Sequence, residues 1–500
     1  MNRRPLFLGS ALCAAFFCVS CANETETVAV PPDNGAVGGW VSFTIDVTGT
    51  LGMTATAGTA VSESVFRPAL QFAPNPDDPE LAAIPATVTI EYGDGSELRA
   101  TVSASSWQAP VHRYAVSASP VSARLRVEPW NALTVINTGF RAGDGGNDQA
   151  GKTDVPFIAY LPPLEAPFGD AGDTLDARTV RAYVGTVVAV ENLQAYPNLL
   201  AFCCEWQPLR ELDLSGLANL RTLEAFYSEI KKTNFQGCAA LRRCCLESTG
   251  ANASWRAVGG SRIESEELDL RDSPLLQDIR GTNDDHVRVR LSSAAKGSLW
   301  HFCKMNNGRM RDIAFDDGGA EPFVLSDFTA LTQCWVSGTP LIGESVLIDN
   351  GVTESLWAAG CGIRDIRAAG QGQLTELDLS FCGAIDRLDI SGCTGLTRLN
   401  LANDQLAGLA IADSARLAYL NLTDCGLSQD LVDSLLATLD SFPTVADYSW
   451  LSEEERADPL KMPVCLASTA NAGRPNAAPS SAGLARLASL RSRGWVISTN

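Results

Sequence analysis

The sequence is poor in histidine and in the motifs that usually reveal a catalytic site. Only three histidines occur in 500 residues, His112, His286 and His301, and none stands at metal-ligand or catalytic-triad spacing. No Gly-x-Ser-x-Gly elbow is present, and no Cys-x-x-Cys pair follows residue 21. We therefore expect no enzyme, no metal site and no cofactor, although paired carboxylates of a hydrolase could still meet in space.

Positive charge is also scarce. The chain has 38 Lys and Arg against 58 Asp and Glu, which gives a net charge of −20. Such a chain is a poor partner for nucleic acid or for an anionic membrane surface. Hydrophobic residues make up 45%, as in globular proteins, and 500 residues are too many for one core, so we expect two or more domains.

Long apolar runs are absent after the first twenty residues. Arg3 and Arg4 precede an apolar stretch over 5–19 that is too short to span a membrane, so 1–20 are predicted to be a signal peptide. Cys-Val-Ser-Cys ending at Cys21 resembles a bacterial lipobox, which implies diacylation of Cys21 and a membrane contact through this lipid anchor only. Ordinary cleavage with an unmodified Cys21 is the alternative.

The polar stretch 21–39 is predicted to be a tether. The acidic residues that follow Cys21 resemble the surface-export signal of Bacteroidota lipoproteins. This resemblance implies an outer-membrane, cell-surface location.

Short alternating runs between 40 and 165 predict an antiparallel β-sandwich. Tyr92-Gly-Asp-Gly-Ser96, followed by His112-Arg-Tyr114, resembles the turn of PKD-like, immunoglobulin-like sandwiches. The resemblance implies that Asp94 and His112 brace this turn and have no catalytic role.

A Gly- and Asp-rich stretch lies at 141–155. We interpret it as a solvated turn, with a calcium loop through Asp144, Asn147 and Asp148 as the alternative. Residues 166–198 are predicted to be a linker and an N-terminal cap.

Residues 199–428 carry a repeat. The pattern Leu-x-x-Leu-x-Leu recurs, and its central positions step by 10 or 11, so a full coil has 21–22 residues. Each coil offers a short strand whose inward residues need neighbouring coils to cover them. The double-pitched pattern, with Cys425 where Asn or Cys is usual, resembles the leucine-rich repeats of Bacteroidota surface proteins.

Residues 429–500 are predicted to form an α/β cap. Helical patterns at 429–439 and 481–491 flank a strand at 464–466. The predicted fold class is therefore mixed and β-rich: an antiparallel β-sandwich, a leucine-rich-repeat solenoid and a C-terminal α/β cap.

Twelve cysteines lie beyond residue 200. Most fall at inward repeat positions, where Cys behaves as a small hydrophobe, so we favour buried thiols. Cys361 and Cys382 lie one coil apart, and a disulfide between them is the alternative.

Two aromatic columns are candidate binding residues. Trp335 and Trp357 occupy the outward position of successive coils, as Trp206 and Tyr227 do farther upstream. Such rings could stack on sugar rings or peptide side chains, or could form an aromatic ladder that serves only the fold. The outward residues of later coils could hydrogen-bond a ligand beside them: Asp378, Asn400 and Asn421.

These features predict a non-enzymatic cell-surface protein that recognises an unidentified protein or glycan through its solenoid. A structural or assembly role inside the bacterial envelope is the alternative, and a polysaccharide or peptide hydrolase is a more distant one.

Overall fold

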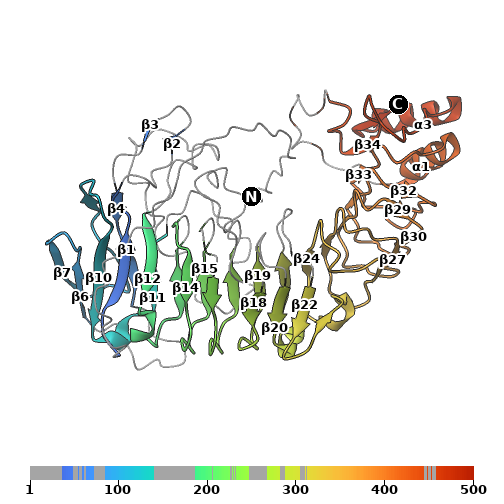
Figure 1. Ribbon diagram of the computed structural model, residues 1–500. Helices are drawn as coiled ribbons and strands as arrows, with labels where there is room; N and C mark the ends of the chain where they lie inside the picture. The colour runs from blue at the N-terminus through green and yellow to red at the C-terminus, as the bar shows by residue number, and fades with distance from the viewer. Residues whose placement is uncertain are drawn as a thin grey trace.

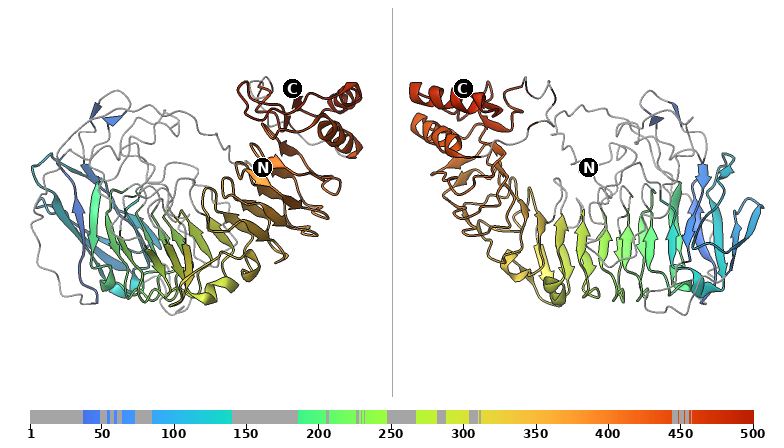
Figure 2. Two further views of the ribbon diagram at one scale, coloured as in Figure 1. Left: turned by 45° about the vertical axis from the view of Figure 1, so that its right-hand side comes forward. Right: turned by 180° about the vertical axis from the view of Figure 1, so that it is seen from behind.

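The protein is β-rich and folds into a curved solenoid with few helices, as a computed structural model shows (Figures 1 and 2). The structure describes residues 37–48, 54–55, 59–60, 64–72, 85–139, 186–204, 207–225, 228, 230, 232–246, 267–281, 288–303, 310, 312–443, 448, 452, 456 and 458–500. The signal peptide, most of the tether, the 141–155 segment and the boundary predicted at 165 lie outside these residues.

The N-terminal part contains a five-stranded antiparallel sheet. Its order is β12 (Val187–Glu191), β1 (Val41–Ile45), β10 (Val121–Glu128), β6 (Ala86–Glu91) and β7 (Glu97–Val102). Alternate residues of β1, β6 and β10 are fully buried, which is the pattern of strands with one face on a core. Two short antiparallel pairs lie outside this sheet: β2 (Thr54–Ala55) with β3 (Thr59–Ala60), and β4 (Ser64–Phe66) with β9 (His112–Tyr114).

The turn between β6 and β7 is braced as its sequence predicts. Nε2 of His112 lies 2.8 Å from Oδ2 of Asp94, and the His112 ring stacks on Tyr92 with centroids 3.8 Å apart. Burial alone would raise the pKa of Asp94, but hydrogen bonds from Ser96 and the contact with His112 lower it to about 2. The carboxylate thus ties the turn to β9.

One fifteen-stranded sheet, here called the long sheet, runs along the whole solenoid (Figure 1). It begins with the antiparallel strands β8 (Ser106–Gln108) and β5 (Ala69–Gln71). A parallel run follows: β11 (Val135–Asn137), β13 (Ala201–Cys203), β15 (Thr222–Glu224), β17 (Arg243–Cys245), β19 (Asp278–Arg280), β21 (His301–Cys303), β24 (Gln333–Trp335), β26 (Ser355–Trp357), β28 (Glu376–Asp378), β31 (Arg398–Asn400), β33 (Tyr419–Asn421), β34 (Val464–Leu466) and β35 (Ile497–Thr499).

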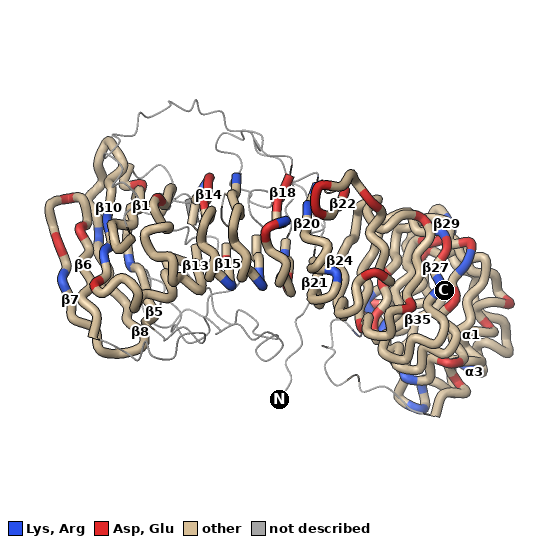
Figure 3. Tube along the Cα trace, turned by 90° about the horizontal axis from the view of Figure 1, so that it is seen from below, with Lys and Arg blue, Asp and Glu red and all other residues tan. Residues whose placement is uncertain are grey.

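Smaller sheets form the other side of the coils (Figure 3). They comprise β14 (Glu211–Asp213) with β16 (Lys232–Asn234), β18 (Glu267–Leu270) with β20 (Arg288–Leu291), β22 (Asp312–Phe315) and β23 (Ala320–Glu321), β25 (Ser345–Leu347) with β27 (Asp365–Arg367) and β30 (Arg387–Asp389), and β29 (Ala384–Ile385) with β32 (Gln405–Leu406). Four short 3-10 helices occur among the described residues: η1 (Trp130–Ala132), η4 (Leu193–Ala195), η6 (Ser293–Gly297) and η7 (Leu325–Asp327).

The two kinds of sheet explain the predicted double pitch. Leu377, Leu399 and Leu420 pair with one another in the long sheet, whereas Ile366 and Leu388, from the half-turns between, pair on the other side. The leucines of the long sheet are buried because each is the central residue of a three-residue strand. The first and third residues point the opposite way, and we call this surface the outer face.

The twelve predicted thiols are all buried, and no disulfide joins Cys361 to Cys382. The Sγ atom of Cys361 lies 3.0 Å from the carbonyl oxygen of Val336, and that of Cys382 lies 3.3 Å from that of Ala358. Each thiol therefore donates to the backbone of the preceding coil. Cys238, Cys393 and Cys425 make the same contact.

The C-terminal cap has the predicted helices and strand. The helices α1 (Gln429–Ser441) and α3 (Ser481–Ser492) begin after the N-cap residues Ser428 and Ser480, whose hydroxyls accept backbone N–H groups. Both lie at the C-terminal end of the arc (Figure 2). β34 and β35 extend the long sheet to its last strand, so the cap continues the solenoid.

Candidate functional site

The side chains on the outer face of the long sheet become more exposed along the solenoid. From β13 to β21 most of its side chains are buried, and from β24 to β33 all of them are half-buried. Trp335 and Trp357 stand where this change occurs. The predicted binding residues Asp378, Asn400 and Asn421 follow them in the same row.

The two tryptophans are stacked face to face. Their ring centroids are 4.1 Å apart and the rings are inclined by only 2°. This close parallel stack follows from the register, which places Trp335 directly beside Trp357 in neighbouring strands. One face of each ring therefore contacts the other ring, and a ligand can contact only the remaining faces and the ring edges.

Asp378, Asn400 and Asn421 hold their own coils together. The Nδ2 of Asn400 donates to Oδ2 of Asp378 at 2.9 Å, and Oδ1 of Asp378 accepts the backbone N–H and the hydroxyl of Ser380. Oδ1 of Asn421 accepts the corresponding groups of Thr423. The hydrogen-bonding capacity that the sequence suggested for a ligand is thus partly used within the fold.

A second row, which the sequence analysis missed, lies beside the tryptophans. Nε1 of Trp357 donates to Oε2 of Glu376 at 3.2 Å, and Arg398 lies 3.8 Å from the same carboxylate. The guanidinium of Arg398 also lies 4.3 Å from the centroid of Tyr419. These residues are first positions of successive strands, so the coil spacing that identified the tryptophans also contained this signal.

Upstream of the tryptophans the outer face holds a buried charged cluster. Asp278 is fully buried and lies 3.0 Å from Arg243 and 3.1 Å from Arg280. Arg243 also contacts Glu224, and Nδ1 of His301 lies 2.6 Å from Oδ1 of Asp278. We call Glu224, Arg243, Asp278, Arg280 and His301 the buried charge cluster.

The ionisation of this cluster follows from its contacts. Burial alone would raise the pKa of Asp278, but the hydrogen bond from His301 and the charge of Arg243 hold it well below its usual range. Burial lowers the pKa of His301, which favours a neutral imidazole that donates to the carboxylate. The His301 ring meets Trp335 edge-on, with centroids 6.3 Å apart, so the cluster adjoins the tryptophan pair.

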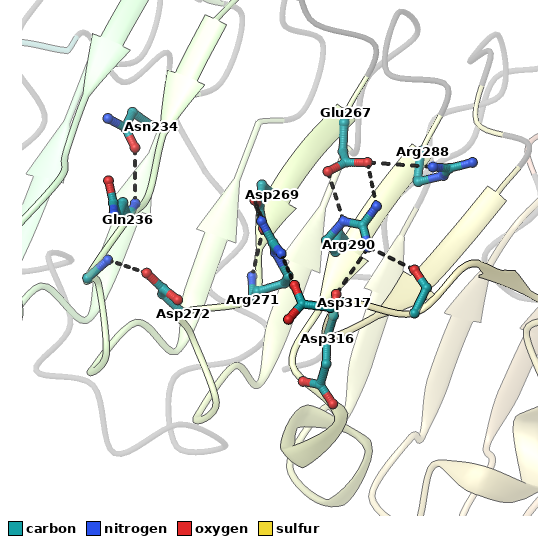
Figure 4. A network of polar contacts seen from close by, with 12 residues as sticks. Asn234, Gln236, Glu267, Asp269, Arg271, Asp272, Arg288, Arg290, Asp316 and Asp317 are labelled. Atoms are coloured by element: carbon teal, nitrogen blue, oxygen red, sulfur yellow. Dashed lines mark hydrogen bonds and ion pairs between the residues drawn. The ribbon is translucent and has the colours of Figure 1, made fainter.

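The other side of the solenoid carries an ionic network of a different kind (Figure 4). Arg290 forms a bidentate hydrogen bond with Glu267. Arg288 forms ion pairs with Glu267 and Asp312. Arg271 donates a hydrogen bond to Asp269. The members are partly exposed and pair between neighbouring coils, which identifies the network as a brace between coils.

Several predicted features lie outside the described residues. They are Cys21, the upstream aromatic pair Trp206 and Tyr227, and the alternative calcium ligands Asp144, Asn147 and Asp148. Within the described part of the chain, no group of His, Cys, Asp and Glu is arranged to hold a metal ion. Among the described residues, no helix has the length and apolar character that crossing a bilayer requires.

One motif escaped the sequence analysis. Gly146-Asn-Asp-Gln-Ala-Gly-Lys-Thr153 has the spacing of a phosphate-binding loop. That loop must open a helix, and Pro156 follows only three residues later, where it would remove a helical hydrogen bond. The position of Pro156 therefore disfavours a phosphate-binding loop, and the segment lies outside the described residues.

Comparisons with known proteins assign no family to this chain. No family model matches the chain, and no curated protein does. Among solved structures the chain is similar to the functional domain of InlJ from Listeria monocytogenes, a domain that includes a cysteine ladder. The identity is 16%, the match covers 53% of this chain and 69% of the other, and the TM-score is 0.27.

Proposed function

We propose that this chain is a non-enzymatic recognition protein that binds a protein or glycan through the outer face between β24 and β33. In this proposal the coils are leucine-rich repeats and the N-terminal strands are a PKD-like sandwich. Lipid on Cys21 would hold the protein at a bacterial surface. The observation that carries the proposal is the pair of stacked, half-buried tryptophans where the outer face becomes accessible.

Two features support this position. Large aromatic side chains with one polar atom are the residues in which binding energy concentrates. The charged residues around them, Glu376 and Arg398, offer hydrogen-bonding groups beside the rings. The combination of aromatic side chains with a polar border is typical of recognition surfaces.

The test is the double change Trp335→Ala/Trp357→Ala, assayed on a glycan array and in a pull-down from host extracellular matrix. We expect bound signal to fall at least tenfold while the thermal unfolding midpoint changes by a few degrees. Leu347→Ala, at an exposed position of β25, is the matched control. If the double variant unfolds, the pair is a structural ladder, and if it binds as before, the proposal is wrong.

Location is tested separately. Labelling with a fatty-acid analogue should mark the wild-type chain and spare Cys21→Ala. Protease treatment of intact cells should then remove the solenoid. A solenoid that survives this treatment would favour the envelope structural or assembly role.

A further inference from the structure

A row of left-handed turn residues follows the strands of the long sheet. Each is the third residue after a strand, and each has a positive φ: Gly338 (73°), Gly360 (68°), Phe381 (62°), Asn403 (65°) and Asp424 (59°). Backbone hydrogen bonds join the row from coil to coil, since the N–H of Gly360 donates to Ser380 at 2.7 Å and that of Phe381 to Ala402 at 2.9 Å. The five positions therefore share one backbone geometry.

Phe381 differs from the other members of this row in its residue type. Gly, Asn and Asp tolerate the left-handed region, whereas a phenylalanine there is strained because its Cβ crowds the following carbonyl. The side chain gains little packing in return, since it is 65% exposed. Its ring has no aromatic partner within the described part of the chain. The fold alone would favour asparagine at this position, as in the next coil.

The surroundings of Phe381 leave room on one side and provide donors on the other. The two preceding turns carry Gly360 and Gly338 at this position, and we call these two residues the glycine floor. A Cβ placed on Gly360 would meet only the backbone of Gly338. On the other side, Nη2 of Arg474 donates to the carbonyl oxygen of Asn403 at 2.9 Å. This bond fixes an exposed guanidinium one coil away from Phe381.

We infer that Phe381, the glycine floor and Arg474 form a carbohydrate-binding site that takes a neutral pyranose. The ring of Phe381 would stack against the C–H face of the sugar, and the backbone floor would accommodate the sugar without a steric conflict. The other guanidinium N–H groups of Arg474 would donate to its hydroxyl oxygens. This site lies on the turn row, distinct from the outer face that carries the tryptophans.

A neutral sugar fits the electrostatics better than an acidic one. The whole chain carries a net charge of −20, and the second coil after Phe381 adds Asp424, whose carboxylate accepts the N–H and hydroxyl of Thr469. A polyanion would meet this field unfavourably. A single guanidinium suffices to orient hydroxyl groups and does not neutralise a charged polymer.

The test uses the full chain and affinity electrophoresis in gels that contain xyloglucan, glucomannan or arabinoxylan, with polygalacturonate as the acidic polymer. We expect at least one neutral polymer to retard the wild-type chain. Phe381→Asn should weaken this retardation at least tenfold and raise the thermal unfolding midpoint or leave it unchanged. Phe381→Tyr should keep most of the binding, and Arg474→Gln should weaken it.

The effects of Phe381→Asn on retardation and on the unfolding midpoint together distinguish a binding role of Phe381 from a structural one. A residue that stabilised the fold would lower the unfolding midpoint when replaced, and that result would overturn the inference. It would also be overturned by equal retardation of wild type and Phe381→Asn, or by retardation in polygalacturonate alone. Leu484→Asn, which replaces another exposed apolar side chain, should change nothing. The comparison of wild type with Phe381→Asn is made with the tryptophan pair intact in both chains, so the difference between them reports the Phe381 site and not the pair.

Discussion

Asp404 is a fully buried carboxyl in the last coils of the solenoid. Its Oδ1 accepts the N–H of Gly383 at 2.8 Å, and its Oδ2 has no hydrogen-bond partner among the described residues. Burial raises the pKa of Asp404 to about 7. The folded chain therefore keeps a proton here at pH values where the unfolded chain has lost it.

This carboxyl should make the protein less stable as pH rises. Below pH 4 Asp404 is protonated in both states and does not lower the free energy of unfolding. Between pH 4 and 7 it lowers this free energy by up to about 4 kcal/mol, and above pH 7 the loss stays constant. Asp404→Asn should flatten the decline in unfolding free energy measured by urea titration from pH 5 to 8. The exposed Asp349→Asn serves as the control. The same slope in wild type and Asp404→Asn would contradict this assignment.

The thiols of the coils should be chemically inert in the folded protein. Burial raises the pKa of Cys238 and Cys425 to about 12 and also raises that of Cys382 and Cys393. Only the thiolate reacts quickly with iodoacetamide. At pH 8 we expect mass spectrometry to find these four unlabelled in the native protein and labelled in 8 M urea. Rapid native labelling of any of them would show that its coil opens.

At the scale of elements, sequence periodicity predicted the strands well and their side-chain contacts poorly. The spacing placed Leu377, Leu399 and Leu420 at inward positions because burial repeats with each coil. It could not reveal the contact between Asp278 and His301, which are 23 residues apart. Their pairing depends on which residue occupies each outward position in neighbouring coils, and no local pattern encodes that choice.

The same limit explains what the sequence missed about the site. Trp335 and Trp357 were recognisable because two large aromatics recur at one register. Phe381 was not recognisable, because the sequence does not reveal that this phenylalanine occupies a left-handed turn. The join of β11 to the long sheet was also hidden, since its partner β13 lies more than 60 residues later.

The buried charge cluster should be an essential element of the solenoid. Asp278→Ala would leave Arg243 and Arg280 near an empty position and should cost about 3–5 kcal/mol of unfolding free energy. The exposed pair Arg364 and Asp386 is the control, because Asp386→Ala should cost about 1 kcal/mol or less. Equal effects of the two changes in chemical denaturation would show that burial of the cluster contributes little.

At the scale of the whole molecule, the cap closes one end of a continuous core. A chain that ends at residue 428 would lose α1, α3, β34 and β35 and would expose the β33 edge. We expect it to self-associate in light scattering, whereas full-length Arg486→Ala, altered only at an exposed ion pair of the cap, should stay in the state of the wild type. A monomeric truncated chain of unchanged thermal stability would show that the coils need no cap.

The three-residue strands of the long sheet also set how the molecule responds to tension. Neighbouring strands of one coil spacing, such as Leu356 and Leu377 or Leu377 and Leu399, are separated by 21 or 22 residues. A coil that detaches therefore releases roughly 70 Å of extended chain. Stretched between its two ends, the solenoid would lengthen in a series of similar small steps. The solenoid would therefore dissipate mechanical energy by unfolding one coil at a time.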